Sequence, residues 1–276
     1  MIIYSDVLLN EVQKQCDEEK LMRELYDYRQ MIVSYVKRDL RARYQGSALG
    51  FLWTFINPLF QLIIYTIVFS TFMRMGIDKF YMFLFVALVP WIFFNSCLQQ
   101  GAMEIIDNKE LVKKIYFPRM ILPMAYVMSC FVNMLLSFAV IFAVIIVTGF
   151  GVSFKALLFL PVIMLIEFML CLGISLITSA CTVYIRDLQH ILAIIGMGWM
   201  YLTPVVYPAS IVPDKYKTLF NLNPMSSIVT AYRDILYYKQ VPHMTTLTQA
   251  TFMGVLLIVI GVVVFNKLQR GFVEEL

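Results

Sequence analysis

The residues that could perform phosphate or acyl chemistry do not fall at the spacing that such chemistry needs. A nucleotide-binding phosphate loop requires Gly-x-x-x-x-Gly-Lys followed by Ser or Thr, but no Gly-Lys pair occurs in the 276 residues. The segment Gly173–Ile177 begins like the Gly-x-Ser-x-Gly turn of a serine hydrolase but lacks the final glycine. The two histidines, His190 and His243, are predicted at membrane edges, where they are poorly placed to activate a serine. We therefore expect neither ATP hydrolysis nor acyl transfer on this chain.

The five cysteines indicate neither a disulfide framework nor a metal site. They are scattered, four of them lie in apolar runs, and no Cys-x-x-Cys occurs. No cysteine has neighbours of the kind that activate a thiol, and two histidines are too few for a His-rich metal centre. The sequence thus predicts no catalytic residue, no metal and no cofactor on this chain. The cysteines are Cys16, Cys97, Cys130, Cys171 and Cys181.

Glu167 is the one acid deep inside a long apolar run, LPVIMLIEFMLCLG. An ionisable residue in such a run is costly to place in a membrane and usually marks a functional or a pairing site. It could line a polar conduit, or it could be neutral and hydrogen-bonded to a neighbouring helix, and we favour the second interpretation. A proton relay would need several such groups, so proton-coupled transport is not expected.

The composition places these residues in a membrane protein. The chain is 61% hydrophobic and 14% charged, whereas a soluble domain is about 45–50% apolar and about 25% charged. The mean hydropathy is +0.77. Intrinsic disorder is excluded because apolar residues are in large excess. The net charge of +4 is small, so the position of the charges matters more than their sum.

We predict an all-α integral membrane protein with six transmembrane helices. A span needs about 20 mostly apolar residues, because the hydrocarbon core of a bilayer is about 30 Å thick. The third and fourth runs are long enough to tilt, and the fifth is short and broken by Pro204 and Pro208. The predicted spans are Phe51–Met73, Phe80–Gln100, Ile121–Val147, Phe154–Val183, Ile191–Tyr207 and Leu247–Phe265.

The placement of Lys and Arg favours a cytoplasmic position for both termini. With that orientation, fifteen basic residues lie on the cytoplasmic side and seven on the outside, as the positive-inside rule requires. The first strongly apolar run begins only near position 49, after a charged segment, so we do not expect a signal peptide.

Residues 1–48 are predicted as a cytoplasmic arm that precedes the membrane domain, residues 49–276. An apolar stripe at helical spacing runs along the arm, with four basic residues near its end. Such a helix typically lies on the membrane surface with its cations at lipid headgroups; alternatively, it packs only on its own protein. The stripe is Leu21, Leu25, Tyr28, Ile32, Val36 and Leu40, and the basic residues are Lys37, Arg38, Arg41 and Arg43.

Two further segments are predicted outside the spans. Residues 102–119 mix apolar and charged residues in a pattern that fits a short cytoplasmic helix ended by Pro118; this helix could contact a cytoplasmic partner or form a solvated loop. Residues 208–246 contain four prolines, with helices expected over Tyr216–Leu222 and Ser226–Tyr238. We expect these helices to dip into the outer leaflet and to pack on the spans, because backbone at membrane depth needs protein or water around it.

Six segments, in order, resemble the permease subunits of type-2 ABC exporters for cell-surface polysaccharides. The resemblance covers roughly residues 25–276 and agrees with six spans and two cytoplasmic termini; residues 1–20 match nothing in the family. The segments are Arg38–Ser70, Val89–Asn95, Asn108–Pro123, Tyr184–Leu192, Trp199–Pro208 and Asn221–Tyr237.

The resemblance implies a half-transporter in a bacterial cytoplasmic membrane. Two copies of the permease would pair with two copies of a separate ABC ATPase, which would bind ATP and Mg²⁺. The cargo would be an undecaprenyl-linked polysaccharide such as an O-antigen or a teichoic acid; no nucleic acid is expected. Leu21–Arg43 would be the interface helix, Glu104–Ile115 the coupling helix, and residues 208–240 the extracellular re-entrant gate helices.

The resemblance also assigns expected roles to individual residues. Two copies would enclose a channel formed mainly by the first and fifth spans, and aromatic rings in it could stack on sugar faces. Coupling to the ATPase is expected at Glu104, Asn108, Glu110, Lys113, Lys114, Arg186 and Asp187. Contact with lipid headgroups or with the cargo pyrophosphate is expected at Lys37, Arg38, Arg41 and Arg43, and channel lining is expected at Trp53, Phe60 and Trp199.

Three alternatives remain open from the sequence. A drug or small-lipid exporter of the same superfamily could share the fold, although Arg38–Ser70 fits the polysaccharide branch better. A lipid-linked sugar transferase would need converging acids or metal ligands, but Asp107 and Asp187 each have basic neighbours and no Asp-x-Asp occurs. A passive channel would need no ATPase partner.

Overall fold

The computed structural model describes residues 26–43, 49–72 and 76–276. Within these ranges the secondary structure consists of helices joined by turns, without a strand. Leu21, Leu25, Cys16 and the segment 1–20 lie outside the described residues. The long helices are α2 (Arg29–Ala42), α3 (Trp53–Thr66), α4 (Phe80–Gln99), α7 (Ile121–Thr148), α9 (Leu160–Tyr184), α10 (Leu188–Leu202), α12 (Pro224–Leu236) and α13 (Met244–Leu268). The short ones are α5 (Glu104–Asp107), α6 (Lys109–Lys114), α8 (Phe154–Leu157), α11 (Lys217–Leu222) and α14 (Phe272–Glu275).

Among the described residues, five helical stretches are long and apolar enough to cross a membrane. They correspond to the first four predicted spans and to the last one. The first continues beyond α3 as a π-helical stretch, Ile67–Phe72. The five stretches are Trp53–Ser70, Phe80–Asp107, Ile121–Thr148, Phe154–Tyr184 and Met244–Glu275.

The helix found at the position of the predicted fifth span is shorter than expected. In its place α10 has 15 residues, which rise about 22 Å and fall short of the roughly 30 Å hydrocarbon core. The helix ends at Leu202 because Thr203 is extended (φ −99°, ψ 139°), as expected for a residue that precedes a proline. The length of this helix therefore does not confirm a sixth span over Ile191–Tyr207.

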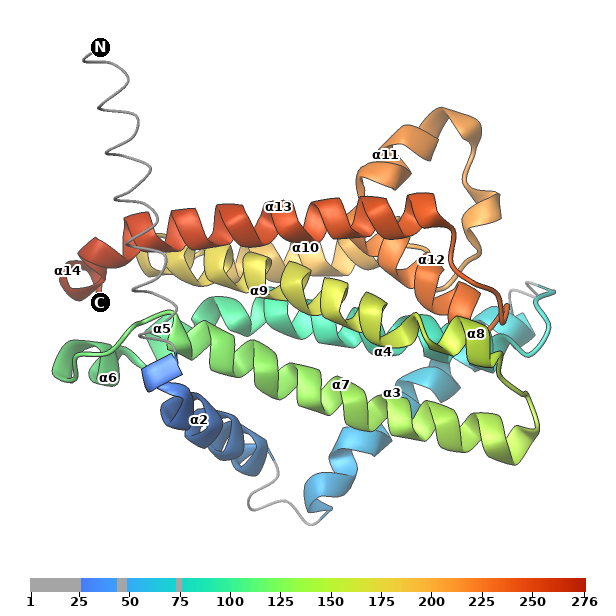
Figure 1. Cartoon of the computed structure of the whole chain (residues 1–276), viewed down its shortest axis with the longest axis horizontal. Helices are drawn as coiled ribbons and strands as arrows, with labels where there is room; N and C mark the ends of the chain where they lie inside the picture. The colour runs from blue at the N-terminus through green and yellow to red at the C-terminus, as the bar shows by residue number, and fades with distance from the viewer. Residues whose placement is uncertain (1–25, 44–48, 73–75) are drawn as a thin grey trace.

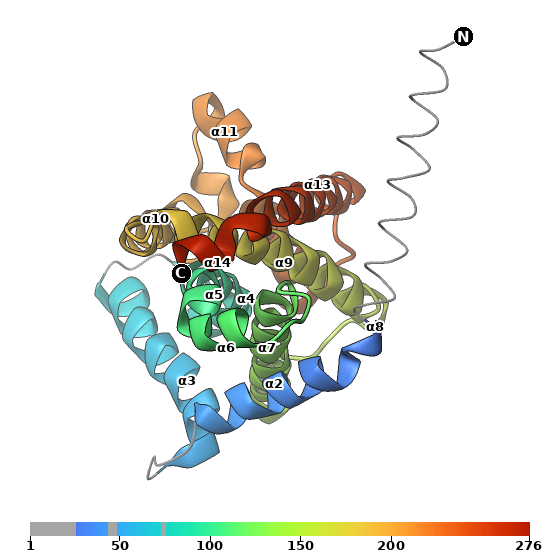
Figure 2. The ribbon, with the colours of Figure 1, turned by 90° about the vertical axis from the view of Figure 1, so that its left-hand side faces the viewer.

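The helices α4, α7, α9, α10 and α13 run side by side along one axis, and shorter helices gather at its two ends (Figure 1). One end carries α5, α6 and α14, and we call it the α6 end. The opposite end carries α8, α11 and α12, and we call it the α12 end. Near the α6 end, α2 lies across the bundle (Figure 2). The helices predicted on the cytoplasmic side and those predicted on the external side thus lie at opposite ends of the bundle.

The helix α4 forms the centre of the bundle (Figure 2). It packs against α3, α7, α9, α10 and α12, and 78% of its most apolar stretch is buried. A helix surrounded in this way can be apolar on every face, which explains why its sequence lacks a polar stripe.

The helices α9 and α13 pack extensively against each other, and three glycines bring the two backbones together. A Cβ atom on Gly173 would lie 2.5 Å from the carbonyl oxygen of Leu257, and one on Gly261 would lie 2.6 Å from that of Gly173. A Cβ atom on Gly254 would lie 3.2 Å from the carbonyl oxygen of Ile166. Small residues at such contacts are the usual means by which membrane helices approach closely.

Candidate functional site

The α2 helix is joined to α7 by a cluster of polar contacts. Arg43 Nε donates to Asp39 Oδ2 at 2.9 Å, and Arg43 Nη2 donates to Cys130 Sγ at 3.3 Å. Ser129 Oγ donates to the same Asp39 carboxylate, and the Arg43 guanidinium lies 5.3 Å from the centroid of the Tyr126 ring. The positive charge of Arg43 is therefore paired within the protein.

The remaining basic residues of α2 have different surroundings. Arg38 Nη2 donates to Asn108 Oδ1 at 3.1 Å and so joins α2 to the α5–α6 loop. Lys37 and Arg41 are exposed, and they keep their predicted role at lipid headgroups as a hypothesis. The apolar stripe residues Ile32 and Val36 are half-buried. The packing of α2 on α7 agrees with the alternative that this helix packs on its own protein.

The predicted coupling helix is two short helices rather than one. The break falls at Asn108, whose φ of −104° and ψ of 23° are not helical. The Asn108 side chain donates to the Glu104 carbonyl at 2.8 Å, a local bond that competes with the helical ladder. The second helix ends at Lys114, four residues before Pro118, because Ile115 is extended. The prediction of a continuous helix over Glu104–Ile115 was wrong.

The outer face of α6 is charged and accessible. Lys114 pairs with Glu110 at 2.8 Å, and this hydrogen bond lowers the pKa of the Glu110 carboxyl. Lys113 is exposed, whereas Val112 is buried and anchors the helix to the bundle. Tyr116, just beyond the helix, is 93% exposed. These residues form a projecting surface of the kind that a cytoplasmic partner could contact.

The other predicted coupling pair, Arg186 and Asp187, lies in the turn between α9 and α10. Both side chains are exposed. Tyr184, at the start of this turn, donates through its hydroxyl to the Leu268 carbonyl at 2.8 Å, and its ring contacts Phe272 of α14 at 6.3 Å between centroids. Because α14 lies at the α6 end (Figure 1), both predicted coupling segments share that end.

The three predicted channel aromatics have unlike surroundings. Trp53 and Phe60 lie on α3 and are 37% and 58% exposed. Trp199 of α10 is half-buried: its ring meets Phe94 edge-on at 5.0 Å, and its Nε1 donates to Asn223 Oδ1 at 2.9 Å. Trp199 therefore joins α10 to the start of α12, whereas Trp53 and Phe60 expose part of their surface on α3.

Glu167 lies inside the bundle, where it is fully buried. Tyr232 Oη of α12 donates to Glu167 Oε2 at 2.7 Å, and the Tyr232 ring stacks on Phe138 of α7 at 5.4 Å. Glu167 Oε1 has no hydrogen-bond partner among the described residues. This geometry matches the interpretation of Glu167 as a residue bonded to a neighbouring helix.

Arg233 is a structurally important residue that its sequence position did not reveal. It is one of the seven basic residues predicted on the outside, but it is only 3% exposed. Its guanidinium donates to the carbonyls of Val205 at 2.6 Å, Tyr207 at 3.0 Å and Phe83 at 3.3 Å. Burial lowers the pKa of Arg233 to about 9, so the group stays protonated at neutral pH. The Tyr-Arg element of Asn221–Tyr237 was the only sequence signal for it.

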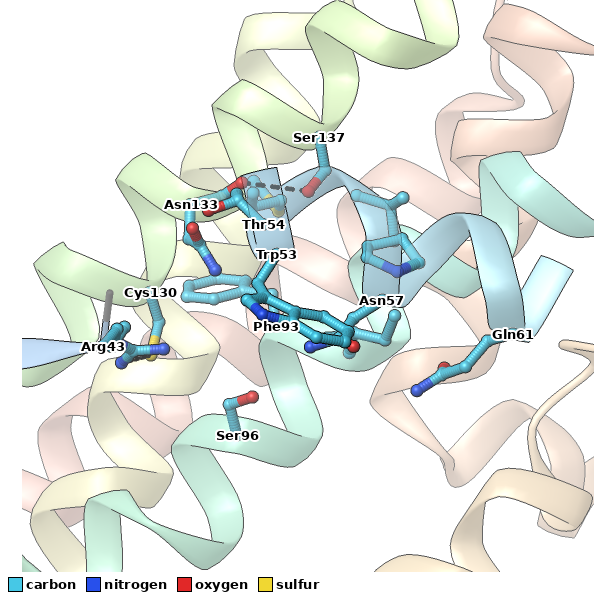
Figure 3. Close-up of a pocket in the computed structure, with 14 residues that line it drawn as sticks. Arg43, Trp53, Thr54, Asn57, Gln61, Phe93, Ser96, Cys130, Asn133 and Ser137 are labelled. Carbon is cyan, nitrogen blue, oxygen red and sulfur yellow. Dashed lines mark hydrogen bonds between the residues drawn. The ribbon is translucent and has the colours of Figure 1, made fainter. Parts of the chain in front are cut away.

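Two cavities open on the α2 side of the bundle. One, of about 470 Å³, lies between α3, α4 and α7 and has Arg43 at its rim (Figure 3). The other, of about 340 Å³, lies between α2 and α5 and is lined by Asp39, Glu104 and Asp107 among others. In the described part of the chain, no group of three or more His, Cys, Asp or Glu residues is placed to hold a metal ion.

Comparison with known proteins places this arrangement among transport proteins. A family model described as "ABC-2 type transporter" matches residues 30–237. The chain is 36% identical over 259 residues to the O-antigen export system permease protein RfbA of Myxococcus xanthus, covering 93% of this chain and 99% of the relative. It is 31% identical over 246 residues to the protein of the same name from Klebsiella pneumoniae, covering 89% and 95%. The polysialic acid transport protein KpsM of Escherichia coli is 21% identical over 238 residues, covering 85% and 92%.

Proposed function

The chain belongs to the ABC-2 type transporter family, and we propose that it is the permease subunit of an ATP-driven exporter of a cell-surface polysaccharide. The observation that carries this proposal is the 36% identity to an O-antigen export permease over almost the full length of both proteins. The more distant relative named for polysialic acid transport also moves a glycan. Both names favour polysaccharide over a drug or a small lipid as cargo.

The proposed topology has six crossings and both termini in the cytoplasm of a bacterium. Although α10 is short, it starts beside α14 at the α6 end, and its last residue, Leu202, accepts a hydrogen bond from Asn223 at 3.3 Å. Since Asn223 caps α12, the chain passes from one end of the bundle to the other across α10. This crossing supports a sixth passage beside the five long stretches. The excess of Lys and Arg in the segments predicted as cytoplasmic supports an α6 end that faces the cytoplasm.

The proposed assembly contains two permease chains and two ABC ATPase chains, with ATP and Mg²⁺ bound to the ATPases. The two permeases face each other along α3 and α10, which lie on the same side of the bundle (Figure 2). A channel between them carries an undecaprenyl-linked glycan, and Phe60 and Trp53 of α3 line it. The exposed, apolar outer surface of α10, which includes Ile194 and Met197, supports a contact with lipid or with a second copy.

Coupling is proposed to run through the charged surface of α6 and through the turn that holds Arg186 and Asp187. Closure of the partner ATPases moves α6, and the bond between Asn108 and Arg38 passes that movement to α2. Because the chain continues from α2 to α3, displacement of α2 shifts the first span. Residues 44–48, which connect α2 to α3, lie outside the described ranges. This step of the proposal therefore rests on the continuity of the chain.

Charge reversal on α6 provides a test of this coupling. We expect Lys113→Glu with Lys114→Glu to reduce export per ATP hydrolysed by about tenfold. The change breaks the pair with Glu110 and places like charges at helical spacing, which is unfavourable. The measurement is glycan export against ATP hydrolysis in proteoliposomes. A matched double reversal at the α12 end, Lys215→Glu with Lys217→Glu, should leave the ratio within about twofold. Wild-type coupling in the α6 variant would contradict the role of this surface.

The function as a whole is tested by what accompanies the chain in its native membrane. Affinity purification in mild detergent, followed by mass spectrometry, should recover an ATPase chain with a phosphate loop in equal amount to the permease. If the permease purifies alone at every salt concentration, the proposal of ATP-driven export fails, and a passive channel becomes the better explanation.

A further inference from the structure

Two lysines at the α12 end hold a backbone conformation that lysine rarely adopts. Lys79 (φ 45°) directly precedes α4, and Lys239 (φ 59°) lies between α12 and α13. They are the two non-glycine residues with a positive φ in the described part of the chain. This conformation is uncommon for a residue that has a side chain, and residues held in it cluster at ligand-binding and switch regions. We call Lys79 and Lys239 the lysine pair.

Both amino groups of the lysine pair approach the same aromatic ring. The Nζ atom of Lys79 lies 5.0 Å from the centroid of the Phe150 ring, and the Nζ atom of Lys239 lies 4.4 Å from it. Lys239 also donates from Nζ to the Phe150 carbonyl. Because Phe150 lies in the connection between α7 and α8, three separate connections meet at this ring, beside α8 (Figure 1). Two positive charges are therefore gathered in one small area of the α12 end.

Neither charge of the lysine pair is neutralised by an acid. The ion pairs found within the described ranges do not involve Lys79 or Lys239, and both lysines are exposed. The neighbouring acid, Asp78, accepts a hydrogen bond from Tyr237 Oη through its backbone carbonyl, at 2.6 Å. The ring of Phe150 attracts the two cations but carries no charge of its own. Both ammonium groups thus remain able to form charge-assisted hydrogen bonds with an anion, and a phosphate group accepts such bonds well.

The ring between the two lysines is fixed by its own neighbours. Tyr237, at the end of α12, stacks on the Phe150 ring with 5.9 Å between centroids. The Tyr237 ring also meets the Phe83 ring of α4 edge-on at 5.3 Å. The position of the lysine pair is therefore set by packing between α4, α12 and the α7–α8 connection. A ligand that binds there meets a site that is already formed, which lowers the entropy cost of binding.

Exposed apolar side chains flank Phe150 along the chain. Ile146 and Val147 in the last turn of α7 are largely exposed, and so are Phe154 and Leu158 at α8. In a membrane protein such a surface faces acyl chains, and lysines beside it reach the level of the lipid headgroups. The α12 end thus presents two free cations next to an apolar surface, which matches the two parts of a phospholipid.

We propose that the lysine pair binds the phosphate group of an anionic phospholipid, whose acyl chains lie against the exposed end of α7 and α8. A free phosphate would offer the lysines the same chemistry but would leave the apolar surface uncovered, so the lipid is the better fit. The bound lipid joins the connections before α4, after α7 and after α12, and it stabilises the α12 end. This inference goes beyond the proposed function, because it depends on the membrane and not on the cargo.

The test measures lipid binding to the full chain, purified in mild detergent together with any ATPase that accompanies it. Native mass spectrometry gives the dissociation constants of phosphatidylglycerol and of phosphatidylcholine with the same acyl chains. Lys79→Gln with Lys239→Gln removes both charges and keeps similar side-chain length, whereas Lys79→Arg with Lys239→Arg keeps both charges. The matched control is Lys215→Gln with Lys217→Gln, which removes two exposed lysines from the same end of the bundle.

We expect the double glutamine variant at the lysine pair to bind phosphatidylglycerol about tenfold more weakly, since it loses two charge-assisted contacts with the phosphate. The arginine variant should stay within about threefold of the wild type, and so should the control variant. Phosphatidylcholine, whose headgroup carries no net charge, should bind the wild type more weakly and respond less to the variants. Equal affinity of the wild type and the double glutamine variant for phosphatidylglycerol would overturn the proposal. An equal loss in the control would also overturn it, because the lipid would then respond to the charge of the whole end.

A soluble competitor identifies the source of the phosphate. Glycerol 3-phosphate has a phosphate group but no acyl chain, so at a concentration equal to that of the lipid it should not displace phosphatidylglycerol. Displacement at that concentration would show that phosphate alone fills the site, and the assignment to a lipid would fail. If the glutamine variant does not purify, Lys79→Asn with Lys239→Asn replaces it, because asparagine tolerates the left-handed conformation; the same tenfold loss is expected.

Discussion

Replacing Gly261 by leucine is expected to prevent the chain from folding into a stable bundle. A Cβ atom at this position would lie 2.6 Å from the carbonyl oxygen of Gly173 and 3.0 Å from its Cα. These are backbone atoms of a helix and cannot rotate away as the end of a side chain can. Overpacking usually costs about 1–3 kcal/mol, and we expect the upper end of that range or more, because α9 and α13 must separate along their length.

The measurement is the yield of monodisperse protein by gel filtration in mild detergent, together with its thermal midpoint. Gly198→Leu is a matched control, because a Cβ atom at Gly198 meets nothing within 4 Å; its yield should equal that of the wild type. Gly254→Ala should lower the midpoint only slightly, since its Cβ atom would lie 3.2 Å from the Ile166 carbonyl oxygen. A Gly261→Leu protein with wild-type yield and midpoint would show that the two helices do not need this contact.

The second large effect is expected at Arg233, in the variant Arg233→Met. Its guanidinium bonds to three carbonyls, and its carbon atom lies 3.5 Å from the centroid of the Phe83 ring. Methionine keeps part of the volume but leaves those carbonyls without this donor, at a cost of about 1–3 kcal/mol for each buried group that stays unpaired. We expect the thermal midpoint to fall by roughly 5–10 °C, and export to fall with it, because residues 203–207 lose their attachment to α12.

Two controls separate the hydrogen bonds of Arg233 from its charge. Arg233→Lys keeps a cation but not the planar fork that reaches several acceptors, so it should fall between wild type and Arg233→Met. Lys215→Met removes an exposed cation at the same end and should change the midpoint by no more than about 1 °C. If Arg233→Met melts with the wild type, the carbonyl contacts do not hold the segment in place.

Most of the helices could be predicted from the sequence, because long apolar runs have few alternatives in a membrane. Five of the six predicted spans correspond to helices of spanning length, and the predicted external helix over Ser226–Tyr238 corresponds to α12, which begins two residues earlier at Pro224. The errors have local causes. Pro204 fixes Thr203 in an extended conformation and so shortens α10, and the side chain of Asn108 bonds to its own backbone turn and divides the coupling segment.

The site was harder to predict, because its chemistry depends on contacts between residues far apart in the chain. Arg43 pairs with Asp39 only four residues before it, but the bonds that tie this pair to Cys130 and Ser129 of α7 become clear only in the structure. The sequence places Arg233 only as a basic residue on the external side, because its carbonyl partners lie up to 150 positions away. The residue types of the coupling surface could be identified from the resemblance, but no sequence pattern places α3 beside α4 and α7 around the cavity of about 470 Å³.

The close approach of α9 and α13 has a mechanical consequence for any opening of the transporter. Where backbones touch, two helices cannot slide or tilt independently, so this pair acts as one rigid block. The helix α3 packs against α4 and α7, and none of these three helices contains a glycine. Side chains therefore separate their backbones, and such interfaces allow small shear displacements. The bundle is thus divided into a stiff frame at α9 and α13 and a deformable edge at α3. Work done by a partner at the α6 end is expected to appear as motion of that edge.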